Sequence, residues 1–183
     1  MLSSLRPYIP VFKFVAVFGG LYIGLSIIYY FYLSFDYGSY HYPDPITSQI
    51  SFQTQELLSL IGYNAQTMNS AGHPSVAVYS NEQLLFRIIE GCNAVSVMIL
   101  FCAFILAFAK AWKKTILFLL IGVGIIYVIN LTRLVLLGVI YADYPAYTHV
   151  SHEIIFPAII YGTTVLLWLY WLKKPKSKHV PTI

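Results

Sequence analysis

Apolar residues are grouped in four long runs along the chain. The runs cover residues 14–35, 94–109, 115–140 and 154–172. A transmembrane helix needs about 20 mainly apolar residues, whereas the strands of a membrane barrel show segments of about 10 residues with alternating polarity. The pattern therefore predicts an all-α integral membrane protein with about four transmembrane helices.

The longest segment between two runs, residues 36–91, predicts a small structure outside the membrane. Apolar side chains at roughly helical spacing over residues 47–63 indicate an amphipathic helix that lies on the membrane surface. Residues 76–79 and 84–89 have the composition of two strands around a turn, which predicts a β-hairpin that leads into the second span. We expect residues 1–183 to form a single polytopic membrane domain.

The composition excludes two other classes of protein. Hydrophobic residues make up 58% of the 183 residues and charged residues 10%, against about 25% charged residues in an average soluble domain. The mean hydropathy is +0.72. A disordered chain contains far fewer apolar residues, and so few charges would cover little of the surface of a soluble globule.

Basic residues gather on one side of the predicted topology. They precede the first run, link the second and third runs and follow the fourth, as Arg6, Lys13, Lys110, Lys113, Lys114, Lys173, Lys174, Lys176 and Lys178. Apart from histidines, residues 36–91 and 141–153 contain one basic residue, Arg87. The positive-inside rule then places both termini, the lysine link and the basic tail, residues 173–183, in the cytoplasm. The net charge of +4 thus reflects membrane orientation, and no folded basic face indicates a nucleic-acid partner.

The first run has the length of a membrane span. Basic residues precede it, no small-x-small cleavage site follows it, and four aromatic residues at positions 29–32 lie near its end. These aromatic residues are typical of the membrane–water interface. We therefore interpret the run as an uncleaved signal anchor rather than as a removable signal peptide.

Three reactive side chains fall at a similar predicted depth on three different helices. Cys92 lies where the chain enters the membrane from the outer side, and His152 lies two residues before the fourth span. Arg133 is about 27 Å along the third helix, close to the outer edge of a core about 30 Å thick. A cation and an imidazole favour a nucleophilic thiolate. In this interpretation Arg133 stabilises the thiolate or an oxyanion and His152 transfers protons.

Each of these residues also has a structural interpretation. Cys92 can act as a small hydrophobic residue, which is what we expect of Cys102, and Arg133 can extend toward the lipid headgroups. His149 lies one turn from His152 and is a second candidate for proton transfer. A metal site formed by Cys92, His149 and His152 is a weaker alternative, because the chain has no CxxC or HExxH spacing.

Three short motifs occur in order beside the apolar runs. They are Glu90-Gly91-Cys92-Asn93-Ala94, Asn130-Leu131-Thr132-Arg133-Leu134 and Ser151-His152-Glu153. This pattern resembles the exosortase/archaeosortase family over about residues 50–172. The small number of spans is similar to that of the short exosortase F type.

The resemblance implies a multi-pass cysteine protease or transpeptidase at the outer face of a bacterial cytoplasmic membrane. The implied partners are the lipid bilayer and an exported protein whose C-terminal sorting signal has a short motif, a hydrophobic helix and a basic tail; no cofactor is implied. Cys92 is then the nucleophile, Arg133 the activating cation and His152 the acid and base. The main alternative is a non-catalytic assembly or export partner, and a transporter or channel is a third, for which four spans are few.

Overall fold

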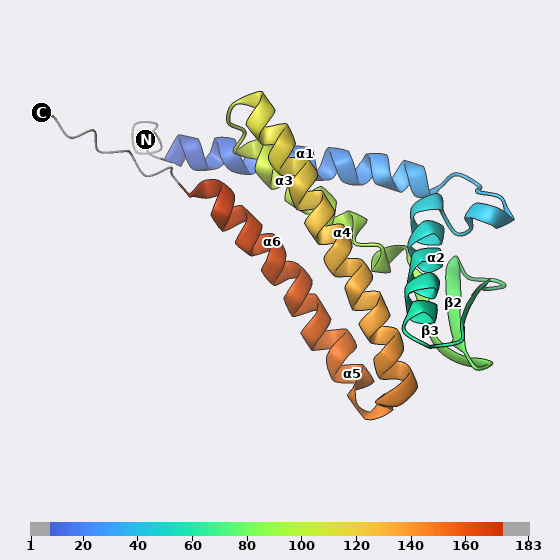
Figure 1. Cartoon of the computed structure of the whole chain (residues 1–183). Helices are drawn as coiled ribbons and strands as arrows, with labels where there is room; N and C mark the ends of the chain where they lie inside the picture. Colours follow the sequence, from blue (N-terminus) through green and yellow to red (C-terminus); the bar gives the residue numbers. More distant parts are fainter. Residues whose placement is uncertain (1–7, 174–183) are drawn as a thin grey trace, which may run out of the picture.

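A helical bundle carries a small sheet at one of its ends (Figure 1). The computed structural model describes residues 8–173. The bundle consists of helices α1 (Ile9–Leu33), α3 (Val95–Ala107), α4 (Trp112–Asp143) and α6 (Phe156–Leu172). Helix α2 (Pro45–Leu60) and strands β1 (Ala65–Asn69), β2 (Ser75–Ser80) and β3 (Gln83–Ile89) lie between α1 and α3 in the chain, and the short helix α5 (Thr148–Val150) lies between α4 and α6.

Three helical segments of the described chain are long and apolar enough to cross a membrane. They are Ile9–Leu33, Trp112–Asp143 and Pro145–Leu172, which correspond to the first, third and fourth predicted spans. The second predicted span forms α3, which has 13 residues and rises about 20 Å, less than the hydrocarbon core of about 30 Å. The helical membrane architecture is therefore confirmed, and the prediction of four full spans is not.

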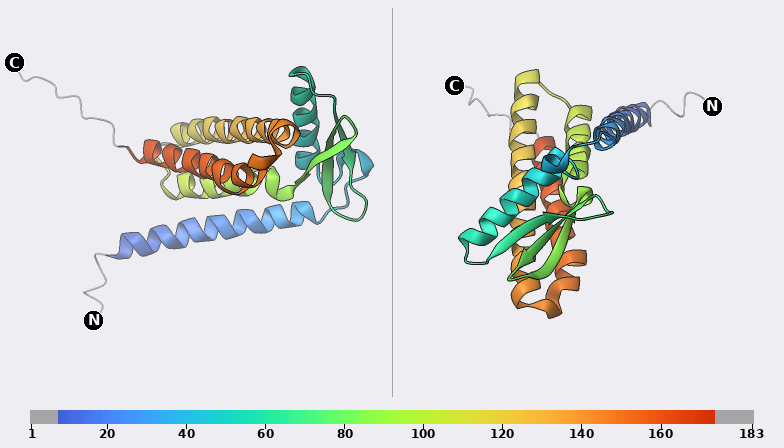
Figure 2. Two further views of the ribbon diagram at one scale, coloured as in Figure 1. Left: turned by 90° about the horizontal axis from the view of Figure 1, so that it is seen from below. Right: turned by 90° about the vertical axis from the view of Figure 1, so that its right-hand side faces the viewer.

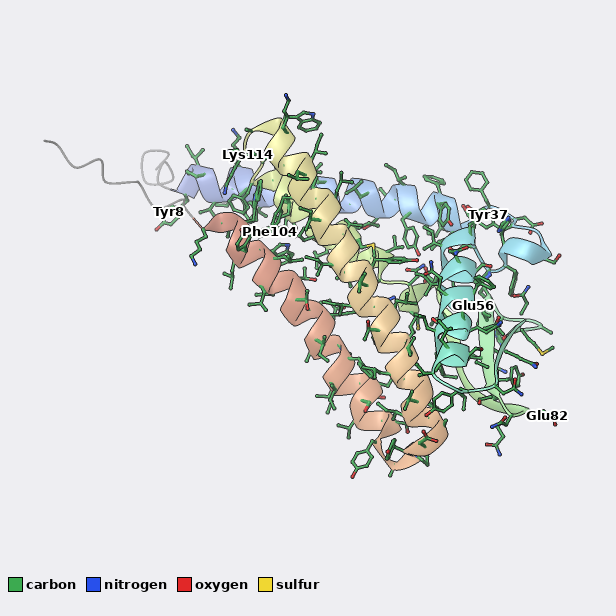
Figure 3. All side chains as sticks on the ribbon, in the orientation of Figure 1. Tyr8, Tyr37, Glu56, Glu82, Phe104 and Lys114 are labelled. Atoms are coloured by element: carbon green, nitrogen blue, oxygen red, sulfur yellow. The ribbon has the colours of Figure 1, made fainter. Side chains whose placement is uncertain are left out.

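The helix ends that carry basic residues lie together. Figure 2 shows the start of α1, the link between α3 and α4 and the end of α6 at one end of the bundle, with α2 and the sheet at the other. Figure 3 shows Tyr8 and Lys114 at the first end and Tyr37, Glu56 and Glu82 at the second. We name these the basic end and the sheet end. The grouping is the one that the predicted topology requires.

The sheet is antiparallel, with the strand order β1-β2-β3. Strands β2 and β3 form the predicted hairpin, and the turn between them places Asn81 and Glu82 at φ values of 48° and 66°. Two left-handed residues in succession are the geometry of the turn that suits the twist of a two-residue hairpin. Strand β1 was not expected, because its sequence, Ala-Gln-Thr-Met-Asn, lacks an apolar alternation.

Helix α2 packs inside the protein with the face that we expected on the membrane surface. Its buried residues are Thr47, Ile50, Ser51, Thr54 and Leu58. Ile50 and Leu58 join a core cluster with the sheet and with Leu134 and Leu137 of α4. Contact between the two helices is close, because a Cβ atom at Gly138 would lie 2.9 Å from a methyl group of Leu58.

Candidate functional site

Cys92 lies in a 3-10 turn, Glu90–Cys92, that joins β3 to α3. Its side chain is half-buried against the core cluster at the sheet end. The following residues reverse the chain into the helix, since Ala94 adopts the left-handed conformation, with φ of 60°. The thiol-bearing turn thus directly precedes the N-terminus of α3, an end of the helix that favours negative charge.

Asn93 fixes this turn to three helices. Its side chain is buried, with an exposed fraction of 1%. Its Nδ2 atom donates to the hydroxyl of Tyr29 on α1 at 2.8 Å and to the hydroxyl of Thr47 on α2 at 3.0 Å. Its Oδ1 atom accepts from the backbone N–H of Val95 at 2.9 Å, in the first turn of α3. We name these four residues the Asn93 hub.

Asn130 of α4 connects Cys92 to Arg133. The Asn130 side chain is buried, with an exposed fraction of 1%, and its Nδ2 atom donates to the backbone carbonyl of Cys92 at 2.9 Å. Its Oδ1 atom accepts from Nη1 of Arg133 at 3.4 Å. The structure therefore connects the backbone of Cys92 to the Arg133 guanidinium, through an amide three residues before the arginine.

The Arg133 guanidinium carries a positive charge that no neighbouring carboxylate offsets. Among residues 8–173, Arg133 forms no ion pair, and its buried Nε atom has no hydrogen-bond partner. A half-buried cation with unused donors can bind an anion more strongly than a solvated one can, because water screens it less. The group is therefore available for a thiolate or for an oxyanion.

His152 is at the sheet-end start of the α6 segment and is exposed. Within the described chain, no hydrogen bond or ion pair joins it to Cys92 or Arg133. It lies in a π-helical turn, Ser151–Ile155. Pro157 follows and has no N–H group for the carbonyl of Glu153, which removes one α-helical hydrogen bond at this point. Such turns are frequent at functional sites.

Within the described chain, no hydrogen bond or ion pair joins the alternative residues to the reactive turn. The Nε2 atom of His149 lies 3.2 Å from the Oε2 atom of Glu153, and both side chains are exposed. Cys102 lies ten residues after Cys92, within α3, and both thiols are free. In the described part of the chain, no three His, Cys, Asp or Glu side chains are placed so that they could hold a metal ion. The alternative metal site of Cys92, His149 and His152 is thus not assembled.

Sequence reasoning did not assign roles to Asn93, Tyr29 or Thr47. Asn93 stands within a motif that we noted, but its partners lie 64 and 46 residues away along the chain. Its burial is therefore a property of the fold. Asn130 also stands within a motif that we noted, and its position one helical turn before Arg133 was the signal in the sequence that could have indicated their contact.

The fold and the site define a class of protein: a helical membrane protein with a cysteine and an arginine held together at one end of the bundle. A family profile described as transmembrane exosortase (Exosortase_EpsH) matches residues 15–170. The chain belongs to the transmembrane exosortase family. No curated protein and no solved structure matches it.

Proposed function

We propose that the protein is a membrane-embedded cysteine transpeptidase or protease that processes C-terminal sorting signals of exported proteins. The observation that carries the proposal is the Asn130 bridge between Cys92 and Arg133, in a chain of the exosortase family. The sheet end faces the outer side of a bacterial cytoplasmic membrane in this proposal, because lysines mark the opposite end as cytoplasmic. The substrate is a protein with a C-terminal hydrophobic helix and a basic tail, as the family resemblance implies.

The proposed reaction is acyl transfer through a thioester. The Cys92 thiolate attacks the carbonyl carbon of the scissile peptide bond, and Arg133 stabilises the resulting oxyanion. The C–N bond then breaks, and His152 gives its proton to the leaving amine. An amine or a water molecule attacks the thioester, loses a proton to His152 and releases the thiolate, so that the enzyme returns to its first state.

The proposal requires His152 to move toward Cys92 when substrate binds. Catalytic hydrogen bonds are often long or absent before substrate binds and form in the complex. The π-helical turn of residues 151–155 supports such a movement, since a small shift of one hydrogen bond there turns the side chain. The contacts of Asn130 with the Cys92 backbone carbonyl and with the Arg133 guanidinium support the roles proposed for these two residues.

The test replaces each cysteine separately. In cells that express the full chain and a tagged exported protein with a hydrophobic C-terminal helix and basic tail, Cys92→Ala should abolish removal of the tail. Cys102→Ala is the matched control and should leave processing unchanged. The readout is the mass of the tagged product, together with the amount of each variant in the membrane.

Unchanged processing by Cys92→Ala would contradict the proposal and favour the non-catalytic partner. In that case Arg133→Leu should still impair export, because a partner helix would depend on the arginine. Loss of processing by Cys92→Ala with normal membrane levels would exclude the partner interpretation.

A further inference from the structure

A groove between the start of α4 and the end of α6 lies at the basic end of the bundle, away from Cys92. Its volume is about 840 Å³. Its lining includes three lysines, Lys110, Lys114 and Lys173, and the apolar side chains of Leu117, Ile121 and Ile125 on α4, which are exposed. The groove thus combines a positively charged entrance with an open apolar lining.

In the part of the chain that the structure describes, no acidic residue lines this groove. Among residues 8–173, none of the three lysines forms an ion pair. Lys110 is fixed in place, since its Nζ atom donates to the backbone carbonyl of Trp171 and lies 4.5 Å from the centre of the Trp171 ring. Lys114 and Lys173 are exposed. The entrance therefore favours a ligand with a negative charge.

The length of the groove matches one leaflet of a bilayer. Lys114 and Ile125 are eleven residues apart on one helix, which corresponds to about 16 Å. Half of the hydrocarbon core is about 15 Å. Tyr170 and Trp171 also line the groove near the lysines, as aromatic residues do at the membrane–water interface.

We propose that this groove binds an anionic phospholipid. The headgroup phosphate lies at Lys110, Lys114 and Lys173, and one acyl chain follows Leu117, Ile121 and Ile125 toward the middle of the membrane. Basic pockets between membrane helices on the cytoplasmic side are typical sites for such headgroups. A hydrophobic peptide with a basic tail does not fit, because the lysines repel its charge. The inference does not depend on the proposed catalytic function.

The test uses the full chain in detergent and native mass spectrometry, with phosphatidylglycerol and phosphatidylcholine of identical acyl chains as probes. Phosphatidylglycerol should bind at least about fivefold more tightly than phosphatidylcholine, because each lysine near a negative headgroup contributes a factor of about five to the affinity. Lys114→Gln should therefore weaken the binding of phosphatidylglycerol by about fivefold. Lys113→Gln is the matched control and should change the affinity by less than about twofold, since Lys113 does not line the groove.

A second variant tests the acyl-chain part. Ile121→Trp fills the groove and keeps all three lysines, so phosphatidylglycerol should bind at least about tenfold more weakly, as expected when well-packed apolar contacts are lost. Equal binding of the two lipids, equal losses in Lys113→Gln and Lys114→Gln, or normal binding by Ile121→Trp would each overturn the proposal. Full competition by glycerol phosphate at matched concentration would overturn it as well, because a free phosphate would then suffice. Thermal unfolding without lipid checks that each variant is folded.

Discussion

Two buried amides hold the peptide around Cys92: Asn93, which directly follows the cysteine, and Asn130, on α4. Asn93 uses both functions of its side chain, donating to Tyr29 and Thr47 and accepting from Val95. Asn130 donates to the carbonyl of Cys92 itself. An amide combines an acceptor oxygen and two donor hydrogens in one neutral side chain. An aliphatic residue at either position leaves buried polar groups without partners.

Replacement of Asn130 should loosen the reactive turn without removing any reactive group. Asn130→Leu removes the hydrogen bond to the Cys92 carbonyl, and we expect a loss of about 1 kcal/mol in the free energy of unfolding. Because Arg133 loses its positioning contact, processing should fall by about tenfold or more. The measurements are denaturation in micelles and the processing rate of the tagged substrate.

Asn64→Leu is the matched control, since Asn64 is exposed; it should change stability by less than about 0.5 kcal/mol. Equal stability and processing in the two variants would show that the Asn130 bridge has no positioning role. Asn130→Asp adds a sharper comparison, because it keeps an acceptor for Arg133 and introduces a charge that offsets the guanidinium. Its processing rate should also fall.

Individual site residues could be predicted from the sequence where the side chain is chemically unusual for its position. An arginine within one apolar run and a cysteine at the edge of another attract attention by themselves. In the structure, the Asn130 amide contacts the Arg133 guanidinium and the backbone carbonyl of Cys92. The hub around Asn93 had no such mark, because asparagine, tyrosine and threonine near a membrane surface are common. The approach of His152 to Cys92 stays a prediction.

Between elements, the contact of α3 with α4 depends on one glycine. A Cβ atom at Gly122 would lie 2.2 Å from the ring of Phe101, which has an exposed fraction of 0%. Gly124, on the same helix, has no atom within 4 Å of the equivalent position. The two glycines therefore differ in packing and share their helical conformation.

Alanine at these two glycines should have effects of opposite sign. Gly122→Ala should destabilise the protein by about 1–3 kcal/mol, because a buried ring must move. Gly124→Ala should be neutral or stabilise it by up to about 1 kcal/mol, because alanine favours the helix. Unfolding of both variants in the same detergent measures the difference. Losses of equal size would show that α3 does not pack closely on α4.

A hydrogen bond from Tyr63 to Asp143 connects the end of α2 to the end of α4. Asp143 accepts this hydrogen bond and so stabilises the protonated phenol. The pKa of Tyr63 is therefore raised above its usual value, which is about 10. A raised pKa in the folded state contributes stability at pH values below about 10, and this contribution is lost as the pH rises further.

The stability difference between wild type and Tyr63→Phe should therefore depend on pH. Wild type should be the more stable protein at pH 8, and the difference should disappear above about pH 10 as the phenol ionises. Thermal unfolding across this range provides the measurement. Tyr79→Phe serves as the control for general alkaline effects, and a difference that stays constant for Tyr63→Phe would rule out the contact as its origin.

Periodicity and length predicted the elements that are long and apolar. The three long helices and the β2–β3 hairpin follow from local pattern, since each needs only its own residues to be recognised. Strand β1 depends on pairing with β2, and its Gln66 and Asn69 have no strand pattern. The sequence also did not predict the length of α3, because the apolar run continues past Ala107, where the helix ends.

For the whole molecule, the two ends of the bundle differ in charge. Lys114 and Glu82 lie at opposite ends (Figure 3). In the proposed orientation, which follows from the positive-inside rule, the lysines lie in the cytoplasm and the hairpin lies outside. The arrangement of the helices is consistent with this orientation, because the start of α1, the link between α3 and α4 and the end of α6 all lie at one end of the bundle (Figure 2).

Single cysteines at the two ends should report this orientation. In a background with Cys92→Ala and Cys102→Ala, Glu82→Cys should react with a membrane-impermeant maleimide in intact spheroplasts. Lys113→Cys should react only after the membrane is disrupted. Labelling of Lys113→Cys from outside, with Glu82→Cys protected, would reverse the proposed orientation.

The shortness of α3 has a consequence for where a thioester would form. Measured from the basic end, 13 residues of α3 reach about 20 Å. Asn130, which contacts the Cys92 carbonyl, lies eighteen residues after the start of α4 at Trp112, about 27 Å along the helix. Both lengths are shorter than a hydrocarbon core about 30 Å thick. In the proposed reaction, the thioester at Cys92 would therefore form slightly inside the outer edge of the core, at a depth that a substrate helix can reach by moving sideways within the bilayer.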